Sequence, residues 1–191
     1  MTEQNNPVTV LGGGSFGTTL AHLIAVRGLP VSLWLRDEQA AESMRRDRVN
    51  ARYLPDLVLH PDLRITTDLQ AAVSAARLVL LAIPSSAFRS VLRQIGPVLD
   101  GKGVVSLTKG IEQPGFRLMS QVVEEEAPGA RVAVLSGPNL AKEIAAGALT
   151  ASVVASKDQA LCAEVQQVLG SRTLRIYASQ DRLGVELGGA I

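Results

Sequence analysis

The sequence predicts an α/β fold, a doubly wound sheet with flanking helices, on three observations. Short aliphatic runs alternate with longer stretches of helical, amphipathic spacing, which is the pattern of βαβ units. Apolar residues make up 47% of the 191 residues, enough for a packed core. A glycine-rich turn directly follows the first aliphatic run. In such folds the ligand lies beyond the carboxyl ends of the strands, so functional residues are sought there.

Eight segments are the expected strands, and several are β-branched runs without polar alternation, as in strands covered on both faces. They are residues 7–11, 31–35, 64–66, 78–83, 103–107, 131–135, 150–155 and 174–177. Apolar residues at helical spacing lie between them. This spacing is clearest at Leu20, Leu23 and Ile24, at Phe88, Val91, Leu92 and Ile95, and at Val165, Val168 and Leu169. Right-handed crossovers then place helices against the sheet.

Charge and composition exclude several classes of function. Nineteen basic and eighteen acidic residues, scattered along the chain, leave a net charge of +1, so no nucleic-acid partner is expected. No apolar run reaches the roughly 20 residues of a membrane span, and the lone Cys162 cannot form an intrachain disulfide. We therefore expect a soluble, cytoplasmic protein without membrane insertion. His22 and His60 have no second ligand at metal spacing, so no metal site is expected.

The turn after the first strand reads Gly12-Gly13-Gly14-Ser15-Phe16-Gly17 and fits the pattern G-x-G-x-x-G. Gly12 permits the tight turn, Gly14 lets a pyrophosphate approach the backbone, and Gly17 lets the next helix pack closely on the strand. The N-terminus of that helix offers N–H groups and the positive end of its dipole to the phosphates. With a strand before it and an amphipathic helix after it, the pattern predicts a Rossmann-type dinucleotide site. The alternative is a structural glycine turn.

The end of the second strand bears on which dinucleotide binds. Arg36 lies about 20 residues beyond Gly17, where a cation accommodates the additional phosphate of NADP and a carboxylate binds the ribose of NAD. Asp37 follows at once, so NADP is favoured and NAD stays open. A solvated surface arginine is the alternative for Arg36.

Two later strand ends carry further candidates. Lys109 follows the strand at 103–107 and precedes a glycine, where a lysine can hold a substrate phosphate or polarise a carbonyl. An ordinary loop lysine is the alternative. After the strand at 131–135, Gly137 can bring backbone N–H groups close to a ligand. Asn139 either caps the next helix or contacts that ligand.

Five segments, in order and over essentially the whole chain, resemble the bacterial NAD(P)-dependent sn-glycerol-3-phosphate dehydrogenase family. They are Gly-Gly-Gly-Ser-Phe-Gly at 12–17, Ala-Ile-Pro-Ser at 82–85, Thr-Lys-Gly at 108–110, Ser-Gly-Pro-Asn-Leu-Ala-Lys-Glu at 136–143 and Gly-Val-Glu-Leu-Gly-Gly-Ala at 184–190. The resemblance implies an oxidoreductase that transfers a hydride reversibly between NAD(P)H and dihydroxyacetone phosphate. The product would be glycerol 3-phosphate for phospholipid biosynthesis. A homodimer is compatible with the sequence, which leaves the oligomeric state open.

By matching position, the resemblance also implies roles for single residues. Those expected to contact the cofactor are Ser15, Phe16, Arg36 and Ala141. Lys109 would contact both cofactor and substrate, and Gly137 and Asn139 would lie at the substrate. The family more often has Ser or Thr followed by Phe where this chain has Asn139-Leu140, so a polar side chain is kept at the substrate position.

A second departure concerns the end of the chain. In the family, the acid/base lysine follows Gly-Gly-Ala after one apolar residue, here Ile191, and a helical domain comes next. Residues 1–191 are therefore expected to form the dinucleotide-binding domain, without the C-terminal helical domain. We expect this chain to bind cofactor with little or no reductase activity, because the alkoxide needs a proton donor within hydrogen-bond reach.

Two other functions stay open at this point. One is another Rossmann dehydrogenase, of the hydroxyacid or ketopantoate type, which shares the first motif. The segments at 108–110 and 136–138 discriminate against it. The other is a noncatalytic dinucleotide-binding or sensor module.

Overall fold

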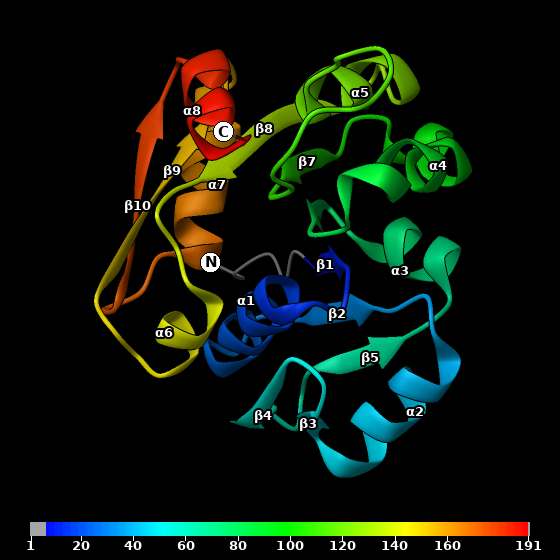
Figure 1. The fold of residues 1–191 in the computed structure, drawn as a ribbon, viewed down its shortest axis with the longest axis vertical. Helices are drawn as coiled ribbons and strands as arrows, with labels where there is room; N and C mark the ends of the chain where they lie inside the picture. The colour runs from blue at the N-terminus through cyan, green and yellow to red at the C-terminus, as the bar shows by residue number, and fades with distance from the viewer. Residues whose placement is uncertain (1–6, 191) are drawn as a thin grey trace, which may run out of the picture.

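A computed structural model describes residues 7–190, which are built around an eight-stranded sheet (Figure 1). Its strands, in chain order, are β1 (Val8–Leu11), β2 (Val31–Trp34), β5 (Arg64–Thr66), β6 (Leu78–Leu81), β7 (Gly103–Ser106), β8 (Arg131–Ser136), β9 (Thr150–Ala155) and β10 (Leu174–Ser179). The order across the sheet is β10-β9-β8-β7-β6-β1-β2-β5. All eight expected strands are present, with small differences at their ends.

The strand order confirms the doubly wound topology. From β1 the chain moves outward through parallel pairs to β2 and β5, and then returns to β6 on the other side of β1. Val10 at the centre of β1 pairs with Leu33 of β2 and Leu80 of β6. The point where the order reverses lies between β1 and β6, which is where such folds bind their ligands.

One pair of strands departs from the expected series of βαβ units. β9 runs antiparallel to β8, with Ser136 opposite Val153, and β10 is parallel to β9. The connection from β8 to β9 holds only the five-residue helix α6 (Ala141–Ala145), which is too short to carry the chain back along the sheet. The chain therefore reverses at the carboxyl edge of β8.

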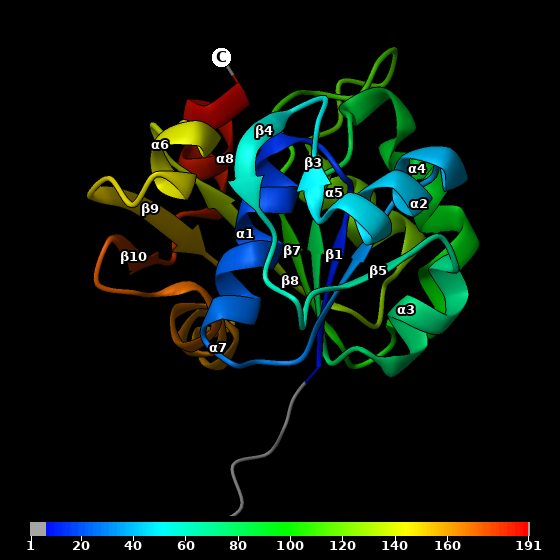
Figure 2. The ribbon, with the colours of Figure 1, turned by 90° about the horizontal axis from the view of Figure 1, so that it is seen from below.

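Helices cover both faces of the sheet and enclose two apolar cores (Figures 1 and 2). On one face lie α1 (Ser15–Val26), α2 (Glu38–Asp47), α6 and α7 (Gln159–Leu169). On the other lie α3 (Leu69–Ala75), α4 (Ser85–Ile95), the 3-10 helix η1 (Gly96–Leu99) and α5 (Met119–Glu126). The last helix, α8 (Arg182–Ala190), packs on β8 and β9. The apolar stripes read from the sequence are buried, with Phe88 and Leu92 of α4 inaccessible to solvent.

A two-stranded hairpin, β3 (Val49–Asn50) and β4 (Leu54–Val58), was not expected from the sequence. The segment contains Asn, Arg, Pro and Asp, which break the aliphatic pattern that marks the other strands. Tertiary burial of Leu54 and Leu59 holds it in place instead. The hairpin lies beside the N-terminal part of α1, as Figure 2 shows.

The described residues also bear on metal and membrane binding. Within residues 7–190, no three or more His, Cys, Asp or Glu side chains are grouped so that they could hold a metal ion. Over the same residues, none of the helices combines the length and the hydrophobicity that crossing a bilayer would need. His22 and His60 contact each other, since the N–H of His60 donates to Nδ1 of His22 at 3.1 Å.

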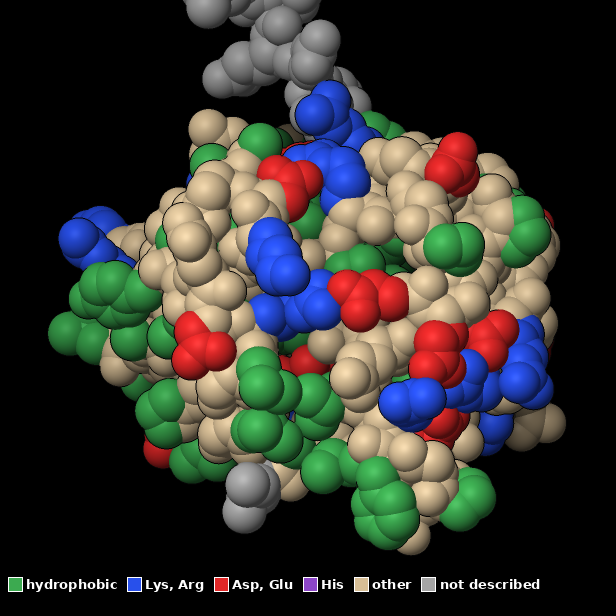
Figure 3. Space-filling model, turned by 90° about the horizontal axis from the view of Figure 1, so that it is seen from above, with side chains coloured by type: hydrophobic (Ala, Val, Ile, Leu, Met, Phe, Trp, Pro, Cys, Tyr) green, Lys and Arg blue, Asp and Glu red, His purple; other side chains and the backbone are tan. Residues whose placement is uncertain are grey.

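An ion-pair cluster joins α4, α5 and the loop that follows β7. Arg89 donates to both carboxylate oxygens of Glu112, at 2.6 and 2.7 Å. It also donates to Glu125 at 2.6 Å and to Glu126 at 2.5 Å. Acidic and basic side chains lie next to one another on the face shown in Figure 3. The cluster ties the loop that begins at Lys109 to two helices.

This cluster predicts a pH-dependent contribution to stability. Hydrogen bonds from Arg89 lower the pKa of Glu112 below its ordinary value. The stabilisation is therefore present above the unfolded pKa of about 4.3 and is lost as the pH falls through the lowered folded pKa. We expect Arg89→Met to lower the Tm by roughly 2–4 °C at pH 7 and by less at pH 3, measured by thermal denaturation. Arg175→Met, which removes an exposed cation from β10, is the control. An equal deficit at both pH values would contradict the prediction.

Candidate functional site

The three motif glycines between β1 and α1 have distinct surroundings. Gly12 has a φ of +122°, and a Cβ there would lie 2.3 Å from the carbonyl oxygen of Ala82. A Cβ at Gly17 would lie 2.1 Å from the carbonyl oxygen of Gly12. A Cβ at Gly14, in contrast, would meet no atom within 4 Å. Gly12 and Gly17 thus serve close packing, whereas Gly14 leaves open space beside the N-terminus of α1.

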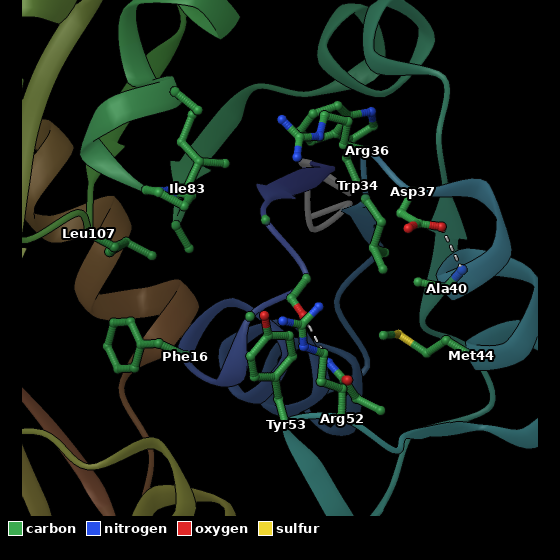
Figure 4. A pocket seen from close by; sticks show the side chains of 18 of the residues that line it. Phe16, Trp34, Arg36, Asp37, Ala40, Met44, Arg52, Tyr53, Ile83 and Leu107 are labelled. Atoms are coloured by element: carbon green, nitrogen blue, oxygen red, sulfur yellow. Dashed lines mark hydrogen bonds between the residues drawn. The ribbon is translucent and has the colours of Figure 1, made fainter.

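A cavity of about 790 Å³ lies over this turn (Figure 4). The volume falls within the range of small-molecule pockets, roughly 300–1,000 Å³. The lining comes from the carboxyl ends of β1, β2, β6 and β7, from the helices α1, α2 and α4, and from the β3–β4 hairpin. Of the residues expected at the cofactor, five line it, namely Gly12, Gly14, Phe16, Arg36 and Lys109. The cavity therefore sits at the switch point of the sheet.

Three other residues expected at the cofactor lie outside this lining. Ser15 is the first residue of α1, and Gly17 is buried beneath the turn. Ala141 is the first residue of α6, and its carbonyl oxygen accepts a hydrogen bond from Oγ1 of Thr19 at 3.3 Å. This bond ties α6 to α1, so Ala141 lies next to the helix that begins at the glycine turn.

The end of β2 presents a cation at the rim of the cavity. Arg36 is exposed and lines the cavity. The carboxylate of the adjacent Asp37 accepts a hydrogen bond from the N–H of Ala40 at 3.0 Å and so caps α2, as Figure 4 shows. An N-cap bond of this kind engages an oxygen that would otherwise be available to a ribose hydroxyl. The rim of the cavity therefore carries a cation, Arg36, next to a carboxylate with one oxygen engaged in capping α2.

The hairpin contributes two lining residues that the sequence did not indicate, Arg52 and Tyr53. The guanidinium carbon of Arg52 lies 5.1 Å from the centre of the Tyr53 ring, within the range of a cation–π contact. In Figure 4 the pair lies across the cavity from Arg36 and Trp34. A basic residue next to an aromatic one, in the polar segment that follows α2, is the signal that could have identified them.

Lys109 and Gly137, both expected at the substrate, are brought together. Oγ1 of Thr108 donates to the carbonyl oxygen of Ile83 at 2.7 Å and lies 3.2 Å from that of Leu81, which ties the loop after β7 to the end of β6. The side chain of the exposed Lys109 extends from the end of β7 toward the end of β8, where its Nζ lies 3.5 Å from the carbonyl oxygen of Gly137. The ends of β7 and β8 therefore form one candidate substrate region beside the cavity.

Asn139 does not cap α6, so the capping alternative is wrong. The cap position is Leu140, which makes no side-chain hydrogen bond there. Instead, Nδ2 of Asn139 donates to Oγ of Ser152 on β9 at 2.7 Å. Its Oδ1 is buried without a hydrogen-bond partner among the described residues. Buried polar atoms in folded proteins normally have a partner, so this oxygen is a candidate ligand contact.

Comparisons with known proteins show the family of this chain. A family model described as "NAD-dependent glycerol-3-phosphate dehydrogenase N-terminus" matches residues 7–162. The glycerol-3-phosphate dehydrogenase [NAD(P)+] of Pseudomonas entomophila is 60% identical over 191 residues, which are 100% of this chain and 56% of that protein. The enzyme of the same name from Azotobacter vinelandii is 58% identical over 185 residues, covering 97% of this chain and 54% of that protein.

A solved structure shares the fold closely. The crystal structure of glycerol-3-phosphate dehydrogenase from Coxiella burnetii superposes with a TM-score of 0.92 at 35% identity, over 96% of this chain and 57% of that one. The chain thus spans a little over half the length of these relatives. Because the family model covers most of its residues, the chain belongs to the NAD-dependent glycerol-3-phosphate dehydrogenase family and corresponds to the N-terminal part of these enzymes.

Proposed function

We propose that this chain binds NADP(H) or NAD(H), with NADP favoured, as the cofactor domain of an enzyme that interconverts dihydroxyacetone phosphate and sn-glycerol 3-phosphate. The observation that carries the proposal is the open space at Gly14, where a Cβ would meet no atom within 4 Å at the N-terminus of α1. That space lets a pyrophosphate approach the backbone N–H groups. Membership of the family supports the choice of reaction.

The lining residues fit the parts of such a cofactor. The first turn of α1, from Ser15 onward, is placed to bind the pyrophosphate, and Phe16 covers one side of the cavity. Arg36 is placed to bind a 2′-phosphate on the adenosine ribose, since a guanidinium suits a phosphate in geometry and charge. Ala141 lies beside α1 and would contact the cofactor from there. The bound nicotinamide would supply the hydride.

The substrate would lie between the ends of β7 and β8. Lys109 would donate a hydrogen bond to the carbonyl oxygen of dihydroxyacetone phosphate and stabilise the negative charge that develops there. Its contact with the carbonyl oxygen of Gly137, at 3.5 Å, supports this role because Gly137 is also expected at the substrate. Oδ1 of Asn139 would accept a hydrogen bond from a substrate hydroxyl.

A chimera tests the proposal. Residues 1–191 would replace the matching segment of the Pseudomonas entomophila enzyme, to which they are 60% identical. We expect the chimera to oxidise NADPH in the presence of dihydroxyacetone phosphate, and the 191-residue chain alone to bind NADPH with weak turnover. Weak turnover by the 191-residue chain is expected because the resemblance places the acid/base lysine after residue 191. In the chimera, this lysine comes from the Pseudomonas entomophila enzyme. A well-folded chimera that binds NADPH but leaves dihydroxyacetone phosphate unreduced would favour the noncatalytic alternative.

The position of Arg36 predicts the cofactor preference. We expect Arg36→Ala to weaken NADPH binding by about 10–100-fold and NADH binding by threefold or less, because only NADPH carries the 2′-phosphate. Titration of cofactor fluorescence with the isolated chain measures both constants. Arg64→Ala, which removes an exposed cation at the start of β5, should leave the ratio unchanged. Equal losses for both cofactors would contradict a 2′-phosphate contact.

A further inference from the structure

A buried asparagine connects the β3–β4 hairpin with the glycine turn. Asn50 is only 5% exposed. Its Nδ2 donates to the carbonyl oxygen of Gly13 at 2.9 Å and lies at the same distance from Oγ1 of Thr18. The main-chain carbonyl oxygen of Asn50 accepts a hydrogen bond from the N–H of Tyr53 at 3.1 Å. One residue therefore bonds to the glycine turn, to the first helical turns of α1 and to the turn of the hairpin.

The bond to Gly13 has a directional effect on the next peptide group. In a trans peptide, the carbonyl of one residue and the N–H of the following residue point in opposite directions. With the Gly13 carbonyl held by Asn50, the N–H of Gly14 is directed away from Asn50. Gly14 is also the position where the open space lies, at the start of α1. An N–H with a fixed direction loses less entropy when it binds an anion than one on a mobile loop.

A main-chain hydrogen bond, from the N–H of Tyr53 to the carbonyl oxygen of Asn50, lies at the opposite wall of the cavity. It closes the turn from 50 to 53, which carries Arg52 and Tyr53 into the cavity lining. The strand register sets Asn50 opposite Leu54, whose side chain is buried and anchors the hairpin. The main chain of Asn50 thus belongs to the hairpin, whereas its side chain contacts the glycine turn and α1.

We propose that the side chain of Asn50 is a positioning group for the cofactor, which fixes the Gly13–Gly14 peptide for the pyrophosphate. The proposal rests on the proposed cofactor site and deepens it. Asn50 is uncharged and would act on the cofactor only through the glycine turn.

Two substitutions separate this role from a merely structural one. Asn50→Ala removes the donor, and Asn50→Asp keeps the shape but places a carboxylate against the Gly13 carbonyl oxygen. We expect both to weaken binding of NADPH and of 2′-phospho-ADP-ribose, by about tenfold for alanine and by more for aspartate. Binding of 2′-AMP, which has no pyrophosphate, should change by threefold or less. Fluorescence titration with NADPH and its displacement by the other two ligands measure all three affinities.

Thr9→Val is the matched control. It removes another buried hydrogen bond, from Oγ1 of Thr9 to the carbonyl oxygen of Ala72 at 2.7 Å, toward the amino end of β1. It should lower the Tm much as Asn50→Ala does and leave all three affinities unchanged. If the Asn50 variants bind all three ligands as the wild type does, or lose affinity for all three equally, the positioning role is overturned. If the wild-type chain binds none of the three, the proposed cofactor site itself fails.

Discussion

Gly14→Val is expected to abolish cofactor binding and leave the fold intact. A Cβ at Gly14 meets no atom within 4 Å, and the residue has φ −74° and ψ 179°, a conformation that valine adopts readily. The valine side chain would fill the space that we assign to the pyrophosphate. We expect the Kd for NADPH to rise by about 100-fold or more, which corresponds to about 2.7 kcal/mol, with a Tm close to that of the wild type. Fluorescence titration and thermal denaturation of the same sample measure the two effects.

Gly17→Ala provides the opposite case with a smaller change in volume. Its Cβ would lie 2.1 Å from the carbonyl oxygen of Gly12 and 3.0 Å from Cβ of Ala82, so the helix must shift. Overpacking of this kind costs typically 1–3 kcal/mol, and the fold should lose stability before any ligand is added. If Gly14→Val bound NADPH normally, or if it unfolded as Gly17→Ala is expected to, the assignment of the open space to a cofactor would be refuted.

Lys109→Met is expected to have the largest effect on catalysis in the chimera. The side chain keeps its length but loses the positive charge that we place at the substrate carbonyl. We expect kcat to fall by about 10²–10⁴-fold, which is the typical effect of removing a group that stabilises developing charge or transfers a proton. Because Lys109 also lines the cofactor cavity, NADPH affinity should fall by a smaller factor. Steady-state kinetics with dihydroxyacetone phosphate, together with NADPH titration, separate the two.

Two comparisons sharpen this test. Lys157→Met removes an exposed lysine that follows β9 at the opposite edge of the sheet, and its kinetics should match those of the unmodified chimera. Lys109→Arg keeps the charge but replaces a compact ammonium with a planar group, so partial activity is expected. A Lys109→Met chimera with undiminished kcat would show that Lys109 is an ordinary loop lysine, the alternative that its position in the sequence left open.

Much of the fold was accessible from the sequence because strands buried on both faces must be continuous aliphatic runs. The segments around Val10, Leu80 and Val105 are of this kind, and each is a central strand in the structure. The glycine turn was equally accessible, since Gly12 and Gly17 stand where any side chain would collide with the backbone. Local composition and steric exclusion carry this information without reference to distant residues.

Other features depend on contacts that a linear pattern does not contain. The reversal of β9 follows from the shortness of α6, because Thr150–Ala155 has the same composition whichever way it runs. Asn139 is a residue type typical of helix caps, and only its bond to Ser152 on β9 shows that its side chain is engaged elsewhere. Asn50 gave no signal at all, since its importance comes from two hydrogen bonds to residues more than 30 positions away.

The parallel direction of the central strands separates the edge of the sheet that lines the cavity from the edge that does not. Because the central strands are parallel, the glycine turn, the hairpin, Lys109 and Asn139 all lie at their carboxyl edge. The amino edge, with the turns at 27–30 and 99–102, contributes nothing to the cavity lining. Exposed positions in those two turns are accordingly the places for a fluorophore, an affinity tag or a tether to a surface, where an attachment stays clear of ligand exchange.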